Sequence, residues 1–226
     1  MIYDNIKPAR FISRPNRFIA NIEIDGKREI SHVKNTGRCR EFLIEGAEIY
    51  VQKAESVTRK TKYDLISVYK GKRLINMDSQ VTNKVVQERL QEGFLFDNIT
   101  LIRPESKYKN SRFDFYVEAE ERKIYIEVKG VTLEENGVVM FPDAPTERGV
   151  KHLRELAECI QDGFEAYVIF VVQMADVKIF KANEKTHKAF AEMLTKVHNE
   201  GVNVLAYECA VTKNSIRMTR QLPVIV

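Results

Sequence analysis

The sequence predicts a small all-β barrel followed by a larger α/β domain with a mixed sheet. Three observations lead to this fold class. The first 80 of the 226 residues read as short alternating strands separated by turn residues. Beyond residue 80 helical and strand patterns alternate. The uninterrupted apolar run from Ala166 to Val172 is typical of a strand that is covered on both faces.

The N-terminal part, residues 1–80, is expected to form an OB-like barrel. Arg17 to Glu23 alternates between apolar and polar residues, and Asp25-Gly26 predicts a hairpin turn into a second strand, Lys27 to Val33. Further strands are expected at 47–53, 63–69 and 73–78, with a short helix at 38–44. Five short strands and one small helix are typical of a barrel of the OB type.

The C-terminal part, residues 81–226, is expected to be the α/β domain. Capping residues and glycines mark where its helices should begin and end. One helix is expected from Thr82 or Asn83 to Glu92, the next from Thr146 to Asp162, and the last from Asn183 to Glu200. Strands are expected at 99–102, 112–118, 123–131, 138–141, 167–172 and 202–209. This order predicts a mixed sheet with helices packed against it.

The positive charge lies mainly in the barrel. Residues 1–80 carry 16 Lys and Arg against 10 Asp and Glu, whereas residues 81–226 carry 20 against 22. Basic residues mixed with aromatic ones suit a polyanion with stackable bases, and therefore a nucleic acid. The alternative is an ordinary solvated basic surface. The candidate nucleic-acid-binding residues are Arg14, Arg17, Arg38, Arg40, Arg59, Lys60 and Lys62.

Other features favour a cytoplasmic protein without a membrane partner. The longest apolar run is far shorter than the roughly 18–20 residues of a membrane helix. The first residues, MIYDNIKPARF, lack the apolar segment of a secretory signal. Cys39, Cys159 and Cys209 are widely spaced, which favours reduced thiols over a zinc cluster.

Two acidic residues mark the candidate catalytic centre. If 112–118 and 123–131 pair as a hairpin turning at Glu120-Glu121, the apolar residues face their counterparts, and Asp114 is placed opposite Glu127. Two carboxylates so close repel each other unless a cation lies between them. Carboxylate oxygens suit Mg²⁺ or Mn²⁺, and Lys129, on the same strand face as Glu127, could orient water or stabilise charge on a phosphate. The alternative is a solvated strand face with alternating charge.

Five further residues are candidates for the same pocket. Asp143 lies between a predicted strand and helix, and Arg148, Lys151 and His152 follow in the first turns of that helix. Basic groups there do not complement the helix dipole, so they could face a phosphate. Glu88, on the preceding helix, could supply another carboxylate. For Glu88, Lys151 and His152 the alternative is simple exposure to solvent.

These residues resemble a known nuclease core and a known family. Asp114 with Glu127-Val128-Lys129 is similar to the PD-(D/E)XK nuclease core, although Phe113 stands where that motif has Pro. The chain also resembles the sugar fermentation stimulation protein family, SfsA, over nearly its whole length. The segments that carry this resemblance are 16–18, 35–38, 59–64, 111–115, 127–133 and 141–153.

The family resemblance implies an OB-like domain before a restriction-endonuclease-like domain, and DNA binding of low sequence specificity. The nuclease core implies that Asp114 and Glu127 bind the metal and that Lys129 is the catalytic lysine. We therefore expect this protein to bind nucleic acid, DNA more than RNA, and to be a phosphodiesterase that depends on Mg²⁺ or Mn²⁺. The alternative is a non-catalytic DNA-binding regulator of sugar-utilisation genes that keeps the nuclease fold.

Overall fold

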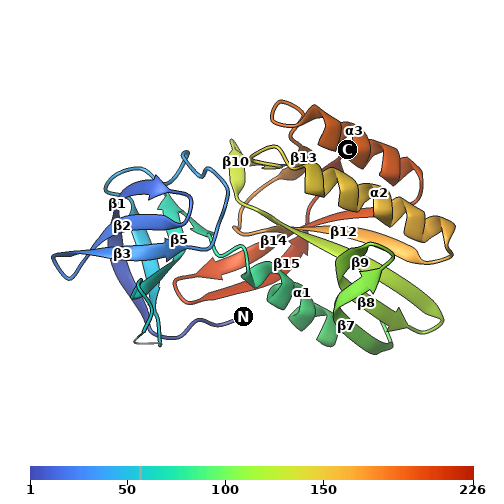
Figure 1. The fold of residues 1–226 in the computed structure, drawn as a ribbon, viewed down its shortest axis with the longest axis horizontal. Helices are drawn as coiled ribbons and strands as arrows, with labels where there is room; N and C mark the ends of the chain where they lie inside the picture. The colour runs from blue at the N-terminus through green and yellow to red at the C-terminus, as the bar shows by residue number, and fades with distance from the viewer. Residues whose placement is uncertain (56–57) are drawn as a thin grey trace.

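A computed structural model describes residues 1–55 and 58–226, and places a β-barrel beside an α/β domain (Figure 1). Within the described residues, no helix is both long enough and apolar enough to span a membrane.

The barrel has the strand order expected of an OB barrel. Its strands are β1 (Ile6–Asn16), β2 (Ile19–Ile24), β3 (Lys27–Val33), β4 (Glu48–Lys53), β5 (Tyr63–Lys70) and the short β6 (Arg73–Asn76). They run in the order β3-β2-β1-β4-β5-β6, and a parallel pairing of β3 with β5 closes the barrel. This confirms the predicted barrel, but the first strand, β1, was not predicted, and β6 lies outside the closed ring.

The predicted helix at 38–44 is wrong, because that segment is a series of turns. The guanidinium of Arg14 binds the carbonyl oxygens of Asn35, Gly37 and Arg38 at 2.6 to 3.0 Å. Because these carbonyl oxygens bind the Arg14 side chain, the backbone of this segment is held in a non-helical conformation. Cys39 also has φ +52°, which no helical residue adopts.

The α/β domain is built on a six-stranded mixed sheet of order β15-β14-β12-β9-β8-β7. Strands β9, β12 and β14 are parallel and central, and the outer neighbours are antiparallel. Its strands are β7 (Ile99–Tyr108), β8 (Ser111–Ala119), β9 (Arg122–Val131), β12 (Glu165–Val172), β14 (Asn203–Thr212) and β15 (Ser215–Gln221). A smaller sheet contains β10 (Leu133–Glu135), β11 (Val138–Phe141), β13 (Ile179–Ala182) and β16 (Val224–Ile225).

Helices cover both faces of the large sheet (Figure 1). Helix α1 (Val81–Gln91) packs on one face, while α2 (Glu147–Gln161) and α3 (Lys188–Asn199) pack on the other. The sheet thus has two apolar cores, and the core under α2 and α3 continues into the barrel. The third helix begins later than predicted, because residues 183–187 form turns.

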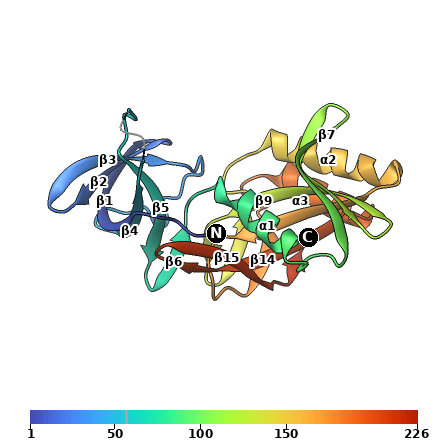
Figure 2. The same cartoon turned by 90° about the horizontal axis from the view of Figure 1, so that it is seen from below.

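The two domains are held together by polar contacts as well as by this core. The carboxylate of Glu134, in β10, forms ion pairs with Lys70 and Arg73 of the barrel, both at 2.8 Å. The side-chain amide of Gln173 donates to Asn76 at 2.9 Å. Seen from below, the β14–β15 hairpin reaches towards β6 (Figure 2). The chain thus fixes the barrel relative to the sheet that carries the candidate site.

Candidate functional site

The hairpin of β8 and β9 has the register that the sequence predicts. Phe115 is paired with Ile126, Tyr116 with Tyr125, and the ladder continues to Ala119 and Arg122. On the β9 side, Glu127 and Lys129 therefore project from the face that lies under α2, whereas Val128 packs in the core under α1. Alternation along one strand thus brings the acid and the lysine together.

The ladder ends before it reaches Asp114 and Glu127, so these two residues are not register partners as predicted. The Asp114 carboxylate Oδ2 instead accepts a hydrogen bond from the Val128 amide at 2.7 Å. On the neighbouring strand, Glu105 has φ +52°, and the ladder between β7 and β8 also omits the Glu105–Asp114 pair. Phe113 consequently packs under α2, away from Val128. A backbone kink therefore turns the Asp114 side chain towards β9.

Glu127 is held on one oxygen and left without a partner on the other. Its side chain is 4% exposed, and its Oε1 atom accepts bonds from the Lys129 ammonium and from Nδ1 of His152. Its Oε2 atom is buried and has no hydrogen-bond partner among residues 1–55 and 58–226. Burial alone would raise the pKa of Glu127, but the bond from His152 and the charge of Lys129 outweigh it and lower the pKa. Glu127 is thus an anion with one unsatisfied oxygen.

A second contact fixes the proton of His152. The Arg148 side chain donates from Nε to Nε2 of His152 at 3.3 Å. Because arginine has no acceptor, Nε2 must be the unprotonated nitrogen and Nδ1 carries the proton that is donated to Glu127. Arg148 and His152 are therefore a supporting pair for the Glu127 carboxylate.

Asp114 is half-buried, and the influences on its pKa partly cancel. Its Oδ1 atom accepts a 2.7 Å bond from the side-chain amide of Asn83, in the first turn of α1. Burial and the nearby charge of Glu127 raise the pKa of Asp114, while the bonds from Val128 and Asn83 act in the opposite direction. The two acids therefore have pKa values shifted in opposite directions, as in many sites that use paired carboxylates.

A pocket of about 410 Å³ opens onto this cluster. Asp114 and His152 line it together with Arg148, and the rest of its wall comes from the tip of the β7–β8 hairpin. The hairpin residues are Glu105, Lys107, Asn110, Ser111 and Arg112. Of the candidate catalytic groups Asp114 therefore borders a cavity whose wall includes Lys107, Arg112 and Arg148.

The donor set suits a hard divalent cation that is held partly by the protein. No cluster of three or more His, Cys, Asp and Glu side chains disposed to hold a metal occurs in the part of the chain that the structure describes. Mg²⁺ is commonly bound by one or two carboxylates, with water and substrate phosphates completing its shell. Asp114 and the unpartnered oxygen of Glu127 meet that requirement.

The structure does not bring Glu88, Asp143 and Lys151 into this cluster. The Glu88 carboxylate pairs with the N-terminal ammonium at 2.5 Å, because residues five apart on a helix, such as Asn83 and Glu88, point in different directions. Lys151 pairs with Glu155 at 3.6 Å. Asp143 instead lies against Gly37 of the barrel.

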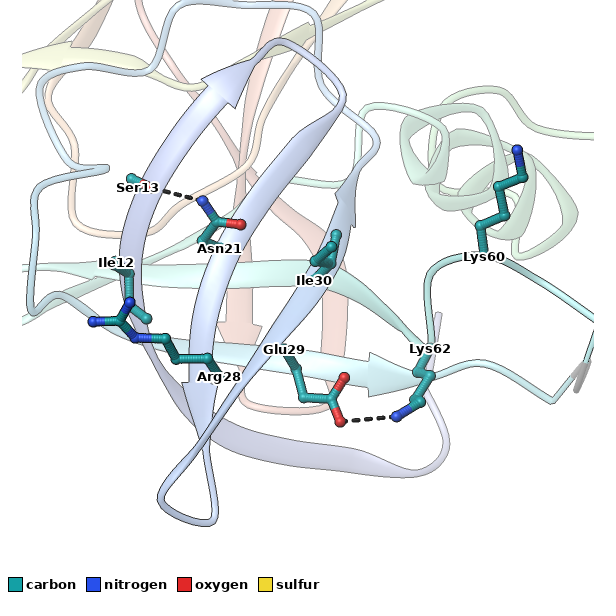
Figure 3. Close-up of a pocket in the computed structure, with 8 residues that line it drawn as sticks. All are labelled: Ile12, Ser13, Asn21, Arg28, Glu29, Ile30, Lys60 and Lys62. Carbon is teal, nitrogen blue, oxygen red and sulfur yellow. Dashed lines mark hydrogen bonds and ion pairs between the residues drawn. The ribbon is translucent and has the colours of Figure 1, made fainter.

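The predicted nucleic-acid-binding residues fall into two groups. Arg14 is occupied by backbone carbonyls, Arg59 forms two bonds to Asp64, and Lys62 pairs with Glu29. Arg59 and Lys62 are nevertheless exposed, as are the other members of the set, Arg17, Arg38, Arg40 and Lys60. A pocket of about 470 Å³ on the outer face of β1–β3 has Ile12 and Ile30 in its wall, with Lys60 and Lys62 on the adjoining loop (Figure 3). Of the predicted set, Arg14 is thus a structural residue.

Sequence reasoning missed Asn83 as a partner of Asp114. The sequence indicates Asn83 only as a helix cap, but α1 begins at Val81, and its preceding turn is held by Asp78, whose carboxylate accepts from the Gln80 amide at 3.0 Å. The side chain of Asn83 is thereby left to face the sheet. One signal could have suggested this contact: Asn83 lies in the first turn of a helix that precedes the two paired strands.

Comparisons with known proteins match both domains. Residues 12–77 match the family model described as the SfsA N-terminal OB domain, and residues 80–215 match the sugar fermentation stimulation protein RE domain. These matches confirm the predicted fold class, an OB barrel followed by a restriction-endonuclease-like α/β domain.

Relatives match the chain from end to end. A sugar fermentation stimulation protein homolog of Clostridium beijerinckii is 59% identical over 100% of both chains. A homolog of Ruminiclostridium cellulolyticum is 58% identical over 99% of both. The solved structure of Pyrococcus furiosus SfsA in complex with Ca²⁺ has a TM-score of 0.91 and 27% identity, and the match covers 100% of this chain and 98% of that one. The chain therefore belongs to the sugar fermentation stimulation protein family, SfsA.

Proposed function

We propose that this protein binds nucleic acid, DNA in preference to RNA, with low sequence specificity, and that it hydrolyses phosphodiester bonds with the help of Mg²⁺ or Mn²⁺. The observation that carries this proposal is the buried, unpartnered Oε2 atom of Glu127 beside Asp114 and Lys129. An unsatisfied carboxylate oxygen in the interior is costly, and a bound cation would satisfy it. The preference for DNA rests on the family resemblance.

Each side chain of the cluster has a role in this reaction. Asp114 and Glu127 would hold the divalent cation, which would supply positive charge to the phosphate and lower the pKa of a bound water. The Lys129 ammonium orients the attacking water and stabilises the developing negative charge. The water oxygen forms the new bond to phosphorus as the bond to the leaving oxygen breaks; the attacking water gives up one proton to solvent and the leaving oxygen takes one up from solvent, so that the net change is the addition of one water. His152 and Arg148 keep the Glu127 carboxylate in place.

Exposed basic side chains of the barrel bind the phosphate backbone of the nucleic acid. Contacts to phosphates give affinity without reading the sequence, which accounts for low specificity. Arg17, Arg38, Arg40 and Lys60 are exposed and suited to this task. The pocket on β1–β3, with an apolar wall beside its cations, suits a base and its phosphate (Figure 3).

The Ca²⁺ named for the Pyrococcus furiosus relative supports the use of a divalent cation by this fold. Ca²⁺ and Mg²⁺ both prefer oxygen ligands, but Mg²⁺ binds closer and keeps its waters in strict octahedral positions. We therefore propose Mg²⁺ or Mn²⁺ as the cation of the reaction, at Asp114 and Glu127.

Cleavage of end-labelled DNA with Mg²⁺, Mn²⁺ or EDTA tests the catalytic proposal. Glu127→Gln and Lys129→Met should each lower the rate by about 100-fold or more, as is typical when a group that stabilises transition-state charge is removed. Lys151→Met is the matched control, since Lys151 pairs with Glu155 outside the cluster, and it should retain full activity. Activity that survives Glu127→Gln unchanged, or that persists in EDTA, would contradict the assignment.

A second function has its own supporting observation. Both oxygens of Asp114 are already bonded, to Asn83 and Val128, and Lys129 is paired with Glu127. A cluster that is so largely satisfied internally would also suit a regulator of sugar-utilisation genes, a role in keeping with the names of the relatives. Such a protein would bind DNA with strong salt dependence but cleave none with any of these cations.

A further inference from the structure

Two basic residues at the tip of the β7–β8 hairpin stand directly opposite each other. Lys107 of β7 and Arg112 of β8 are register partners in the ladder between these strands, and both side chains are exposed. The Cβ atoms of such partners are about 4.5–5.5 Å apart, and like charges in this position destabilise a sheet. The hairpin therefore contains an unfavourable pair that an anion would relieve.

Neither cation is well neutralised by the protein. Arg112 lies 3.6 Å from Glu105, with side-chain exposures of 68% and 63%, and an ion pair so exposed contributes little. Lys107 has no carboxylate within ion-pair distance in residues 1–55 and 58–226. Lys109, two residues further along the same hairpin, instead pairs with Asp162 at 2.8 Å and Glu158 at 3.5 Å.

The unneutralised cations face the candidate catalytic centre. Lys107 and Arg112 line the same pocket of about 410 Å³ as Asp114 and His152, whereas Lys109 does not. Arg148 of α2 contributes a third cation to the pocket. Poorly neutralised positive charge thus lies on the hairpin where it borders Asp114.

We propose that Lys107 and Arg112 form a phosphate clamp, which binds the backbone of the substrate strand next to the phosphodiester held at Asp114. This inference rests on the proposed nucleic-acid binding. It adds the direction of approach, because the nucleic-acid strand would reach Asp114 along the β7–β8 hairpin. A backbone phosphate between the two side chains would neutralise both, and Arg112 can exchange its weak contact with Glu105 for a charge-assisted bond to phosphate oxygens. The clamp holds the strand in place, and the chemistry remains with the acids and Lys129.

Binding measurements with a matched control test the clamp. Anisotropy of a fluorescein-labelled DNA single strand and of its duplex is titrated in EDTA over a range of salt concentrations. Lys107→Gln and Arg112→Gln should each weaken binding by about 3–10-fold, and each should reduce the steepness of the salt dependence by roughly the contribution of one phosphate contact. Lys109→Gln removes the same charge from the same hairpin but should change neither quantity by as much.

Thermal unfolding separates this role from a structural one. Lys107→Gln removes the like-charge opposition, so its melting temperature should equal or exceed that of the unchanged protein while its affinity falls. Where cleavage is measurable, the same variant should raise KM with kcat largely retained. A lower melting temperature accompanied by a proportionate loss of affinity would instead indicate a structural role and overturn the clamp.

The failure of the clamp is distinguishable from the failure of the proposed function. If the unchanged protein binds DNA but Lys107→Gln and Lys109→Gln lose affinity equally, only the general charge of the domain matters and the clamp is wrong. If DNA binds and the clamp variants behave as expected while no cation supports cleavage, the clamp stands and the catalytic proposal fails. A protein that binds neither the single strand nor the duplex would overturn both.

Discussion

At the scale of single residues, the amide of Asn83 determines how Asp114 is presented. It donates to one carboxylate oxygen while the Val128 amide donates to the other, and these two bonds hold a half-buried acid whose pKa is raised by partial desolvation. Groups that orient a metal ligand are commonly as important as the ligand itself. Asn83 is therefore a positioning residue for the proposed cation site.

Replacing Asn83 by Leu should lower the affinity for Mn²⁺ by about 10–100-fold, the usual cost of losing such an outer contact. Titration calorimetry of the purified variant measures this directly. Lys84→Gln, one position along the same helix and exposed, is the control and should bind Mn²⁺ as the unchanged protein does. Equal affinities for Asn83→Leu and the unchanged protein would show that Asp114 needs no support from α1.

Part of this site was predictable from the residues. Strand alternation places Glu127 and Lys129 on one face, and matching the apolar residues gives the correct register from Phe115 onwards. The position of Asp114 was not predictable, because no residue pattern marks the positive φ of Glu105 on the neighbouring strand or the break in strand pairing at Asp114. The contact of His152 with Glu127 depends on how α2 crosses the sheet, which the sequence pattern does not specify.

At the scale of elements, Arg14 organises the loop that follows β3. Its guanidinium donates to the carbonyls of Asn35, Gly37, Arg38 and Arg17, at distances from 2.6 to 3.0 Å. Sequence reasoning assigned Arg14 to nucleic acid because an arginine in a basic segment has the same pattern in either role. Only the fold shows that these carbonyls converge on it.

Arg14→Ala should therefore lower the free energy of unfolding by about 2–4 kcal/mol, since it removes several charge-assisted hydrogen bonds and leaves carbonyls unpaired. Arg17→Ala, at an exposed side chain nearby, should change it by less than about 0.5 kcal/mol. Urea denaturation followed by circular dichroism measures both. Similar, small effects for the two variants would contradict the structural role of Arg14.

The strand β1 was not predicted because it contains two prolines. Its sequence contains Pro8 and Pro15, which usually argue against a strand. In the barrel, Pro8 pairs with Tyr50 of β4, while the pairing of β1 with β2 begins only at Arg10. A proline is tolerated where one side of the strand has no partner. The same reasoning applies to β7, an edge strand that continues through Pro104.

At the scale of the whole molecule, Glu134 joins the two domains. Burial would raise its pKa, but bonds from Lys70 and the Gly137 amide and the charges of Lys70 and Arg73 outweigh it, so the pKa lies below the usual 4.5. The ion pair therefore contributes its full stability above the unfolded-state pKa. The contribution is lost as the pH falls through the lower pKa of the folded state.

We expect Glu134→Gln to destabilise the protein at neutral pH by about 1–3 kcal/mol, because the barrel cations lose their anion. The difference between the variant and the unchanged protein should shrink as the pH is lowered through and below about 4.5, where Glu134 itself becomes neutral. The urea concentration at the midpoint of unfolding, measured for both proteins from neutral to acidic pH, tests this expectation. A difference that is independent of pH would mean that the charge of Glu134 has no part in joining the domains.

The change of pattern along the sequence predicts a division at residue 80, but no such pattern predicts the contacts between the two parts. The apolar core under α2 and α3 extends into the barrel, and the N-terminal residue Tyr3 packs in the core under α1. The Met1 ammonium also binds Glu88 of that helix. Such contacts join residues far apart in sequence, so no local pattern predicts them.

The central claim is that Asp114 and Glu127 together hold a divalent cation. It is tested most directly by anomalous diffraction from crystals soaked in Mn²⁺. The account predicts a single strong peak at about 2.0–2.3 Å from the Oε2 atom of Glu127 and from a carboxylate oxygen of Asp114. Crystals that take up Mn²⁺ at other sites but show no peak between these two acids would contradict it.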